Sequence, residues 1–404
     1  MDDRLIELEV ENFRSLRKVR LPLGPLNVLV GPNGAGKSNV LEVFRFLADV
    51  IRTDLEPALN DRGGFDEVVF WGGDQPPSSI QIKLMATWTR YSSPSAPDEY
   101  DLRIARRRNQ RSKEMSLSRR ETFQFKRTKG RGRRITITGQ KVEVVGIGRD
   151  DDTSSERSIG IRRLSSGLST LPRLADEEGG TEVTTMAGHL QSFRVFDVNV
   201  GAARRPAKIY SPGAHPRLDD AAGNLAEFLL ALADTNRDRL AALIADATQV
   251  LPQLKGIGFE FPSGPAREAV VVLHEWGLRR STPLADASYG TIRLLGLLAL
   301  LYDPDPPALT CVEEIDHGLH PQALELLIER LREASERTQF LIATHSPAFA
   351  DRLKPEELII CERRSDGSSV IPALSTRQIK ETVAKSEGLP LGDLWFSGAL
   401  GGDL

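Results

Sequence analysis

The sequence predicts an α/β fold with a mixed sheet core, an antiparallel β meander and an inserted helical region. Three observations lead to this prediction. A glycine-rich turn at 31–38 joins an almost wholly apolar run, typical of a strand buried on both faces, to a helical pattern. Apolar and polar residues alternate in short runs over 79–146, as in antiparallel strands. Two more apolar runs, at 309–312 and 339–343, flank an amphipathic helix, which is typical of a parallel strand–helix–strand unit.

The N-terminal half of the chain contains the first strands, a helix and the meander. We expect strands over 4–10 and 25–31 around a turn containing Pro22 and Gly24. A helix starts near Lys37, because apolar residues then recur at three- and four-residue steps. Residues 148–182 are rich in Asp, Ser, Arg and Gly and are expected to form a mobile loop.

The C-terminal half returns to helices and buried strands. We expect a helix over 222–250 and short strands near 256–261 and 269–275. We then expect a leucine-rich helix over Thr291–Leu301, a strand over Leu309–Val312, a helix over Pro321–Ser335 and a strand over Gln339–Ala343. About one more strand and one more helix follow. The predicted organisation is a discontinuous head at 1–90 and 265–375, a basic meander at 91–150, a loop and helical insertion at 151–264, and a tail at 376–404.

Composition narrows the class of protein. The chain has 404 residues, 40% hydrophobic and 27% charged, which is typical of globular domains and suits two or three structural units. The longest apolar run, Leu294–Tyr302, has nine residues, whereas a membrane span needs about 20. The start of the chain does not resemble a secretory signal, and two cysteines cannot form a disulfide framework or a Cys-rich zinc site. We therefore expect a cytoplasmic protein with no membrane partner.

Residues 31–38 read Gly-Pro-Asn-Gly-Ala-Gly-Lys-Ser and match the phosphate-loop pattern G-x-x-x-x-G-K-[ST]. The glycines let successive backbone N–H groups point at phosphate, and the following helix adds its positive N-terminus. Lys37 is expected to reach the β- and γ-phosphates, and Ser38 to hold Mg²⁺. ATP and Mg²⁺ are the expected cofactors, and the nucleotide ligands from this segment are Asn33, Gly34, Ala35, Gly36, Lys37, Ser38 and Asn39.

Two later apolar strands end in polar side chains that suit phosphate chemistry. Glu313 follows one strand on the expected Mg²⁺ side, and Glu314 is placed to polarise the attacking water. His345 follows the other strand, 32 residues after Glu313, which leaves room for one crossover helix. The carboxyl ends of parallel strands meet at one sheet edge, where ligands bind in open α/β folds. His345 is therefore expected to contact the γ-phosphate or the water.

A third segment places Ser288 and Gly290 at the start of the leucine-rich helix. A helix N-terminus can bind phosphate, so these residues are expected to read a nucleotide. Because the chain already has one phosphate loop for its own nucleotide, we expect a second phosphate-binding segment to contact the nucleotide bound by another subunit. The alternative is that Ser288 only caps its own helix.

These residues and their order resemble the RecF/SMC-like ABC ATPases, and more narrowly the compact, arm-less AAA-type ATPases related to the OLD family. The segments that resemble these proteins are Leu8–Leu16, Gly31–Asn39, Ser288–Thr291, Glu313–Pro321 and Thr344–Pro347. Glu313 stands where Asp is usual, Ile315 where Pro is frequent, and Tyr289 where a small or acidic residue is common. The resemblance implies a P-loop NTPase of the ABC-ATPase head type.

The resemblance also implies how the protein works. Two heads would dimerise head-to-tail around two ATP molecules. Ser288 and Gly290 of one head would then face five residues of the other: Lys37, Ser38, Glu313, Glu314 and His345. Arg14 and Ser15 match a position near the base and sugar, while Gln75 and Gln81 are both conceivable as the Mg²⁺-sensing glutamine. OLD nucleases carry a metal-binding TOPRIM domain, but the 57 residues after Pro347 contain no Asp-x-Asp pair. A separately encoded nuclease or effector is the partner that the resemblance implies.

A basic segment lies within the predicted meander. Residues 103–134 contain fourteen Lys or Arg and two acids, although the whole chain has a net charge of −3. Such a cluster could follow the phosphates of DNA or RNA, or it could be a solvated sheet edge that resists aggregation. Its proposed contacts are Arg103, Arg106, Arg107, Arg108, Arg111, Lys126, Arg127, Arg131, Arg133 and Arg134.

The sequence thus predicts an ATP-hydrolysing protein that dimerises on ATP and acts on DNA, in repair or in anti-phage defence. The alternative is an ATP-dependent sensor or scaffold for a protein effector, without direct binding of nucleic acid. Salt dependence of nucleic-acid binding separates the two.

Overall fold

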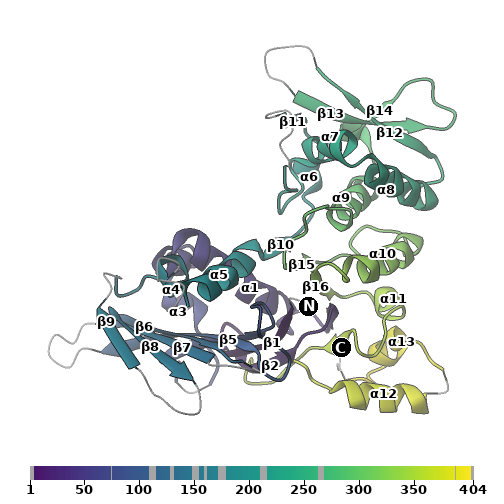
Figure 1. The fold of residues 1–404 in the computed structure, drawn as a ribbon. Helices are drawn as coiled ribbons and strands as arrows, with labels where there is room; N and C mark the ends of the chain where they lie inside the picture. Colours follow the sequence, from purple (N-terminus) through teal and green to yellow (C-terminus); the bar gives the residue numbers. More distant parts are fainter. Residues whose placement is uncertain are drawn as a thin grey trace.

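The fold is given by a computed structural model that describes residues 4–73, 75–108, 115–127, 132–147, 154–158, 162–171, 179–209, 216–262, 268–386 and 388–401. Two large sheets form its centre, one parallel with five strands and one antiparallel with eight. The antiparallel sheet lies on one side of the molecule, and the inserted helices and strands extend above the parallel sheet (Figure 1).

The parallel sheet has the strand order β10-β15-β16-β3-β17. Its members are β3 (Leu26–Val30), β10 (Arg194–Phe196), β15 (Leu309–Glu313), β16 (Gln339–Thr344) and β17 (Leu358–Ile360). Every neighbouring pair is parallel, with Glu313 opposite Ala343 and Thr344 opposite Val30. The segments that follow β3, β15, β16 and β17 therefore all leave from the same edge.

The antiparallel sheet has the order β2-β1-β4-β5-β6-β7-β8-β9. Its strands are β1 (Leu5–Phe13), β2 (Leu16–Pro22), β4 (Ser79–Ala86), β5 (Asp98–Arg108), β6 (Met115–Phe125), β7 (Gly132–Thr138), β8 (Lys141–Ile147) and β9 (Ser154–Ser158). Alternate residues of β4 to β7, such as Ile82, Phe123 and Ile135, are buried in the same hydrophobic core as α1. The helices on this side are α1 (Lys37–Thr53), α2 (Leu55–Asn60), α3 (Phe65–Val68), α4 (Gly167–Thr170) and α5 (Gly180–Ser192).

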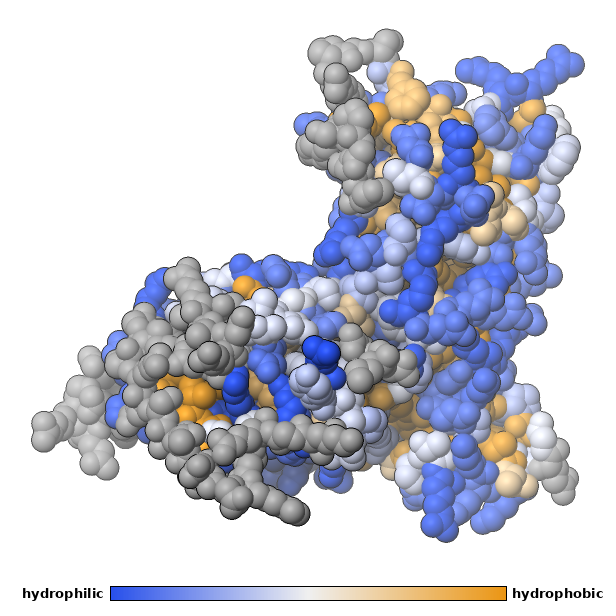
Figure 2. Space-filling view, in the orientation of Figure 1, coloured by the Kyte–Doolittle hydropathy of each residue, from blue (hydrophilic) through white to orange (hydrophobic). Residues whose placement is uncertain are grey.

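The insertion and the last helices belong to a second core, built around α9 and α10. Its elements are α6 (Val200–Ala203), β11 (Ala207–Lys208), α7 (Leu225–Thr235), α8 (Arg237–Val250), β12 (Leu254–Glu260), β13 (Glu268–Glu275), β14 (Thr282–Pro283), the short 3₁₀ helix η3 (Leu284–Asp286), α9 (Tyr289–Leu301) and α10 (Pro321–Ala334). After β16 come α11 (Pro347–Ala350), β18 (Glu362–Arg363), β19 (Ser369–Val370), α12 (Thr376–Lys385) and α13 (Leu391–Phe396). Most of the described surface in Figure 2 is hydrophilic, and hydrophobic atoms gather around the β12–β13 sheet.

The predicted fold class is confirmed, and three predicted segments are wrong. The region before β3 is not a simple turn, because Leu16, Val19 and Leu21 are buried and form strand β2. The predicted loop at 148–182 contains β9, α4 and the start of α5, and its other residues lie largely outside the described ones. The tail after Pro347 has three short strands and three helices rather than one of each. These strands and helices are stabilised by contacts with distant segments. The polarity of the local sequence does not reveal such contacts.

Among the described residues, no helix is long and apolar enough to cross a membrane. The longest helix among them, α1, has 17 residues.

Candidate functional site: a phosphate loop at the carboxyl edge of the parallel sheet

The phosphate loop connects β3 to α1 at the carboxyl edge of the parallel sheet. Gly34 and Gly36 have φ angles of 79° and 100°, in the left-handed region that favours glycine. No side chain caps the N-terminus of α1, and its first turn contains no acid. The first N–H groups of α1 and its positive end therefore remain available for an anion.

Lys37 lies inside this loop. Its Nζ donates hydrogen bonds to the carbonyl oxygens of Gly31 at 2.7 Å and Pro32 at 3.0 Å, and it lies 3.3 Å from His345 Nδ1. Burial lowers the pKa of Lys37 to about 8, because the charged ammonium loses its hydration inside the protein. Burial, and then the nearby Lys37 charge, also lowers the pKa of His345. The structure thus brings together two residues that are 308 positions apart in the sequence.

The acidic pair lies on the same edge as Lys37 and His345. Glu313 ends β15 and is half-buried, while the side chain of Glu314 is 57% exposed. Both Glu314 and Asp316 raise the pKa of Lys37 by charge attraction, although burial outweighs them. Thr344, at the end of β16, donates a hydrogen bond to Asp316 and so links β16 to the segment after the acids. Carboxylates, an imidazole and an ammonium group therefore face one phosphate-binding loop.

A buried arginine that the sequence analysis missed holds the acidic pair. Arg293 of α9 is 2% exposed, and its Nη2 donates to the carbonyl oxygens of Glu313 at 3.3 Å and Glu314 at 2.6 Å. Glu314 has a φ of 46°, which is uncommon for a residue with a side chain. The arginine stabilises this backbone conformation, and Asp197 pairs with its other nitrogen. The signal in the sequence was a lone charge within an otherwise apolar helix.

The predicted second phosphate reader lies at the start of α9. Ser288 Oγ accepts a hydrogen bond from the Thr291 N–H at 3.1 Å, so it does cap its own helix. A Cβ at Gly290 would lie 2.8 Å from the Gly318 carbonyl oxygen, and the Tyr289 ring lies 5.5 Å from that of His317. Among the described residues, no hydrogen bond joins Ser288 or Gly290 to the phosphate loop of the same chain.

Arg14 and Ser15 lie on the other side of the loop. Asn39 Nδ2 donates to Ser15 Oγ at 2.7 Å, and Arg14, Ser15 and Asn39 line a cavity of about 660 Å³. The exposed Asn33 and the buried Ala35 complete the loop, and the Ser38 side chain is exposed at the start of α1. Gln81 Nε2 donates instead to the Asp101 carboxylate on the antiparallel sheet, and Gln75 is exposed.

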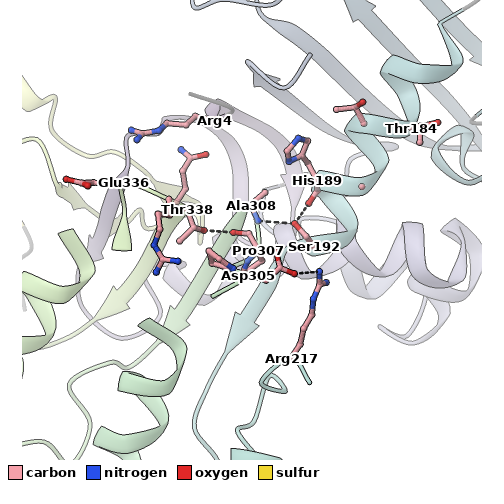
Figure 3. Close-up of a pocket in the computed structure, with 15 residues that line it drawn as sticks. Arg4, Thr184, His189, Ser192, Arg217, Asp305, Pro307, Ala308, Glu336 and Thr338 are labelled. Carbon is pink, nitrogen blue, oxygen red and sulfur yellow. Dashed lines mark hydrogen bonds and ion pairs between the residues drawn. The ribbon is translucent and has the colours of Figure 1, made fainter. Parts of the chain in front are cut away.

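A second cavity lies at the opposite, amino edge of the parallel sheet (Figure 3). It has a volume of about 570 Å³, and its walls include Arg4, His189, Asp305 and Gln339. Asp305 and Pro307 precede β15, and Thr338 precedes β16. None of the predicted nucleotide ligands lines this cavity.

Residues 26–351 match the protein family described as "AAA domain, putative AbiEii toxin, Type IV TA system". The OLD nuclease of Thermus scotoductus is 47% identical over 55 residues, which cover 14% of this chain and 10% of that protein. The DNA replication and repair protein RecF of Lactobacillus acidophilus is 34% identical over 88 residues, covering 21% and 23%. The chain thus spans about a tenth of the first of these proteins and less than a quarter of the second.

The fold is similar to that in the crystal structure of the SmcHead bound to the C-winged helix domain of ScpA. The TM-score is 0.56 at 14% identity, and the match covers 94% of this chain and 99% of the other. At this identity the likeness shows the fold alone. The resemblance drawn from the motifs is confirmed: the chain belongs to this AAA-domain family, is related to OLD, SMC and RecF proteins, and has the fold of an SMC-type ABC-ATPase head.

Proposed function

We propose that this protein binds and hydrolyses ATP, dimerises head-to-tail when ATP is bound, and acts on DNA in repair or anti-phage defence with a separate nuclease or effector. The observation that carries this proposal is the meeting of Lys37 and His345, 3.3 Å apart, at the edge where the acidic pair also lies. These four groups come from the ends of three neighbouring parallel strands. Family membership adds to the same reading.

The residues present fit a triphosphate with Mg²⁺. The uncapped start of α1 supplies N–H groups, and the ammonium of Lys37 supplies a buried positive charge. The Ser38 hydroxyl and the Glu313 carboxylate are oxygen ligands of the kind that Mg²⁺ prefers. When bound, this ion would offset charge that develops on the phosphates.

The side chains then divide the chemistry of hydrolysis. Lys37 binds the β- and γ-phosphates, and Glu314 accepts a proton from the attacking water. His345, whose lowered pKa favours the neutral ring, can accept or donate a hydrogen bond at the γ-phosphate or the water. Arg293 is a positioning residue, because it holds the carbonyl oxygens of both acids.

Replacing Arg293 with methionine is expected to lower kcat for ATP hydrolysis at least tenfold while leaving the Kd for ATP nearly unchanged. Loss of its hydrogen bonds would release the φ of Glu314 and leave buried carbonyl oxygens unpaired, at a cost of about 2 kcal/mol in the free energy of unfolding. Steady-state kinetics, calorimetric ATP binding and urea unfolding measure these effects. The matched control is Arg330→Met, which breaks an ion pair with Asp246 away from the acids. An equal loss of kcat in both variants would argue against positioning.

The open face of the antiparallel sheet is the proposed DNA-binding surface. Arg103 and Arg120 are exposed and lie directly opposite each other on β5 and β6, in a cross-strand row with Gln81, Thr138 and Lys141. Like charges in this arrangement destabilise a sheet. Asp101 attracts both arginines, and an anionic partner would relieve more of their repulsion. The row presents hydrogen-bond donors across neighbouring strands, as a phosphate backbone requires.

Not every predicted basic contact suits this surface. Arg106 pairs with Asp66, Lys126 with Glu99 and Arg127 with Glu182, so their charges are used within the chain. Arg119 was not among the predicted contacts; it is buried and donates to the Gly139 carbonyl oxygen. Arg107 is exposed on β5, Arg133 and Arg134 lie on β7, and Arg134 donates to Gln124. Arg111, Arg131 and the side chain of Arg108 lie outside the described residues.

Charge reversal of the facing pair, Arg103→Glu with Arg120→Glu, is expected to weaken DNA binding at least tenfold at low salt. Removing two phosphate contacts should also reduce the slope of log affinity against log salt by about 1.5. Fluorescence anisotropy with a labelled oligonucleotide across a salt series measures both quantities. The control is Arg279→Glu with Arg280→Glu, two exposed arginines after β13 that change the net charge equally. Equal binding by both variants would disprove the assignment of this face.

The scaffold alternative has one observation in its favour. Phe261, Trp276 and Leu278, in the segments next to β12 and β13, are 59%, 65% and 57% exposed. Exposed apolar side chains of this kind suit a protein partner. Either no DNA binding by the unaltered protein, or binding whose affinity has a salt slope near zero, would favour this alternative.

A further inference from the structure

A short hairpin after β17 lies directly on the phosphate loop. The hairpin consists of β18 and β19, residues 362–370, and follows the residues matched by the family, 26–351. Its Ser369 N–H donates to the Ser15 carbonyl oxygen at 2.8 Å, and the two serine hydroxyls lie 2.7 Å apart. A Cβ at Gly36 would lie 2.1 Å from Ser369 Oγ. Any side chain at position 36 would therefore clash with Ser369, so the hairpin can pack on the loop only because residue 36 is glycine.

The hairpin also brings an arginine to the loop. Arg363 Nη1 donates to the Gly34 carbonyl oxygen at 3.1 Å. The side chain is exposed, and it forms no ion pair with a carboxylate in the part of the chain that the structure describes. A guanidinium group has five N–H donors, so most of them remain available.

Arg363 lines the cavity of about 660 Å³ that also borders Arg14, Ser15 and Asn39. Arg62 shares this wall, but Glu42 and Asp49 each pair with it at 2.7 Å. Glu67 also lines the cavity, but among the described residues it forms no ion pair with Arg14 or Arg363, so these two cations remain without a carboxylate partner. Two such guanidinium groups beside a phosphate loop favour a phosphate ligand, because the planar fork matches phosphate oxygens.

We propose that Arg363 is a nucleotide-binding residue, which donates to a phosphate oxygen of the nucleotide held by the loop. This inference rests on the proposed function and adds a contact from the C-terminal hairpin to it. Lys37, Glu314 and His345 do not line the cavity of Arg363, so this contact lies away from the end where hydrolysis would occur. The phosphate that Arg363 contacts is therefore one that ADP retains.

The test is calorimetric titration of the full chain with ATP and with ADP. Arg363→Ala is expected to weaken both ligands by about tenfold, as loss of a charge-assisted hydrogen bond does. Arg363→Lys should restore part of the loss, because it keeps the charge without the fork. The control, Arg364→Ala, removes the neighbouring exposed arginine, which does not line the cavity. Thermal unfolding without nucleotide should be unchanged in all three variants.

Two results would overturn the inference: unchanged affinity of Arg363→Ala for both nucleotides, or a loss confined to ATP. Failure of the proposed function gives a different result, because Lys37→Ala would then also bind ATP normally. If Lys37→Ala loses ATP binding as expected but Arg363→Ala binds ATP with full affinity, Arg363 is not a nucleotide-binding residue, while the role of the phosphate loop stands.

Discussion

Lys37→Ala is expected to reduce ATP affinity at least a hundredfold. Among the described residues, the Lys37 ammonium forms hydrogen bonds with two backbone carbonyl oxygens and His345, and burial lowers its pKa despite the attraction of Glu314 and Asp316. Phosphates would supply an anion at short distance in a poorly solvated loop, where charge attraction is strong. The alanine variant loses this attraction together with its hydrogen bonds.

The same reasoning predicts that this variant folds normally. Burial costs the Lys37 charge more than its attraction to Glu314 and Asp316 returns. Removing the charge therefore relieves a net desolvation penalty, and the free energy of unfolding without nucleotide should stay the same or increase. Calorimetric titration and urea unfolding measure the two properties on one sample. Lys18→Ala, a change at an 85% exposed lysine on β2, is the control. ATP affinity within threefold of the unaltered protein would contradict the role of Lys37.

Glu314→Gln is expected to slow hydrolysis by about a hundredfold or more, which is the usual contribution of a general base. The change keeps the size of the side chain and adds no strain beyond the existing φ of 46°. If two heads close around ATP, blocked hydrolysis should trap them as a dimer. Light scattering with ATP and Mg²⁺ should then show twice the 44.5 kDa mass of the chain.

Two controls make this dimerisation result specific. Glu325→Gln alters an exposed acid on α10 and should leave both turnover and mass unchanged. Ser288→Arg added to Glu314→Gln should restore the monomer, because the start of α9 would then repel or clash with the second head. A trapped protein that keeps the monomer mass at saturating ATP would rule out the head-to-tail arrangement.

Local pattern was enough to predict the strand, loop and helix at the centre of the candidate site. The apolar residues of β3, the glycines and the amphipathic α1 are adjacent in sequence, so their spacing fixes their geometry. The contact between Lys37 and His345 could also be predicted from the sequence, because parallel strands bring their carboxyl ends together.

Contacts between distant segments were not predictable from pattern. Ser15 and Ser369 are 354 positions apart, and nothing in either short polar segment indicates that they touch. Strand β2 looked like a turn because it ends at Pro22 and Gly24 follows, although burial of Val19 and Leu21 against the sheet decides its conformation. The ion pairs that occupy Arg106, Lys126 and Arg127 likewise involve partners far along the chain.

Strand β17 covers one side of β3, and the hairpin that follows it rests on the phosphate loop. An expression fragment cut at residue 351, where the family match ends, would lack both. It would leave the backbone edge of an apolar central strand open to other chains, a common cause of insoluble material. Low yield of such a truncated protein would then reflect a missing edge strand rather than a failure of the nucleotide-binding motif.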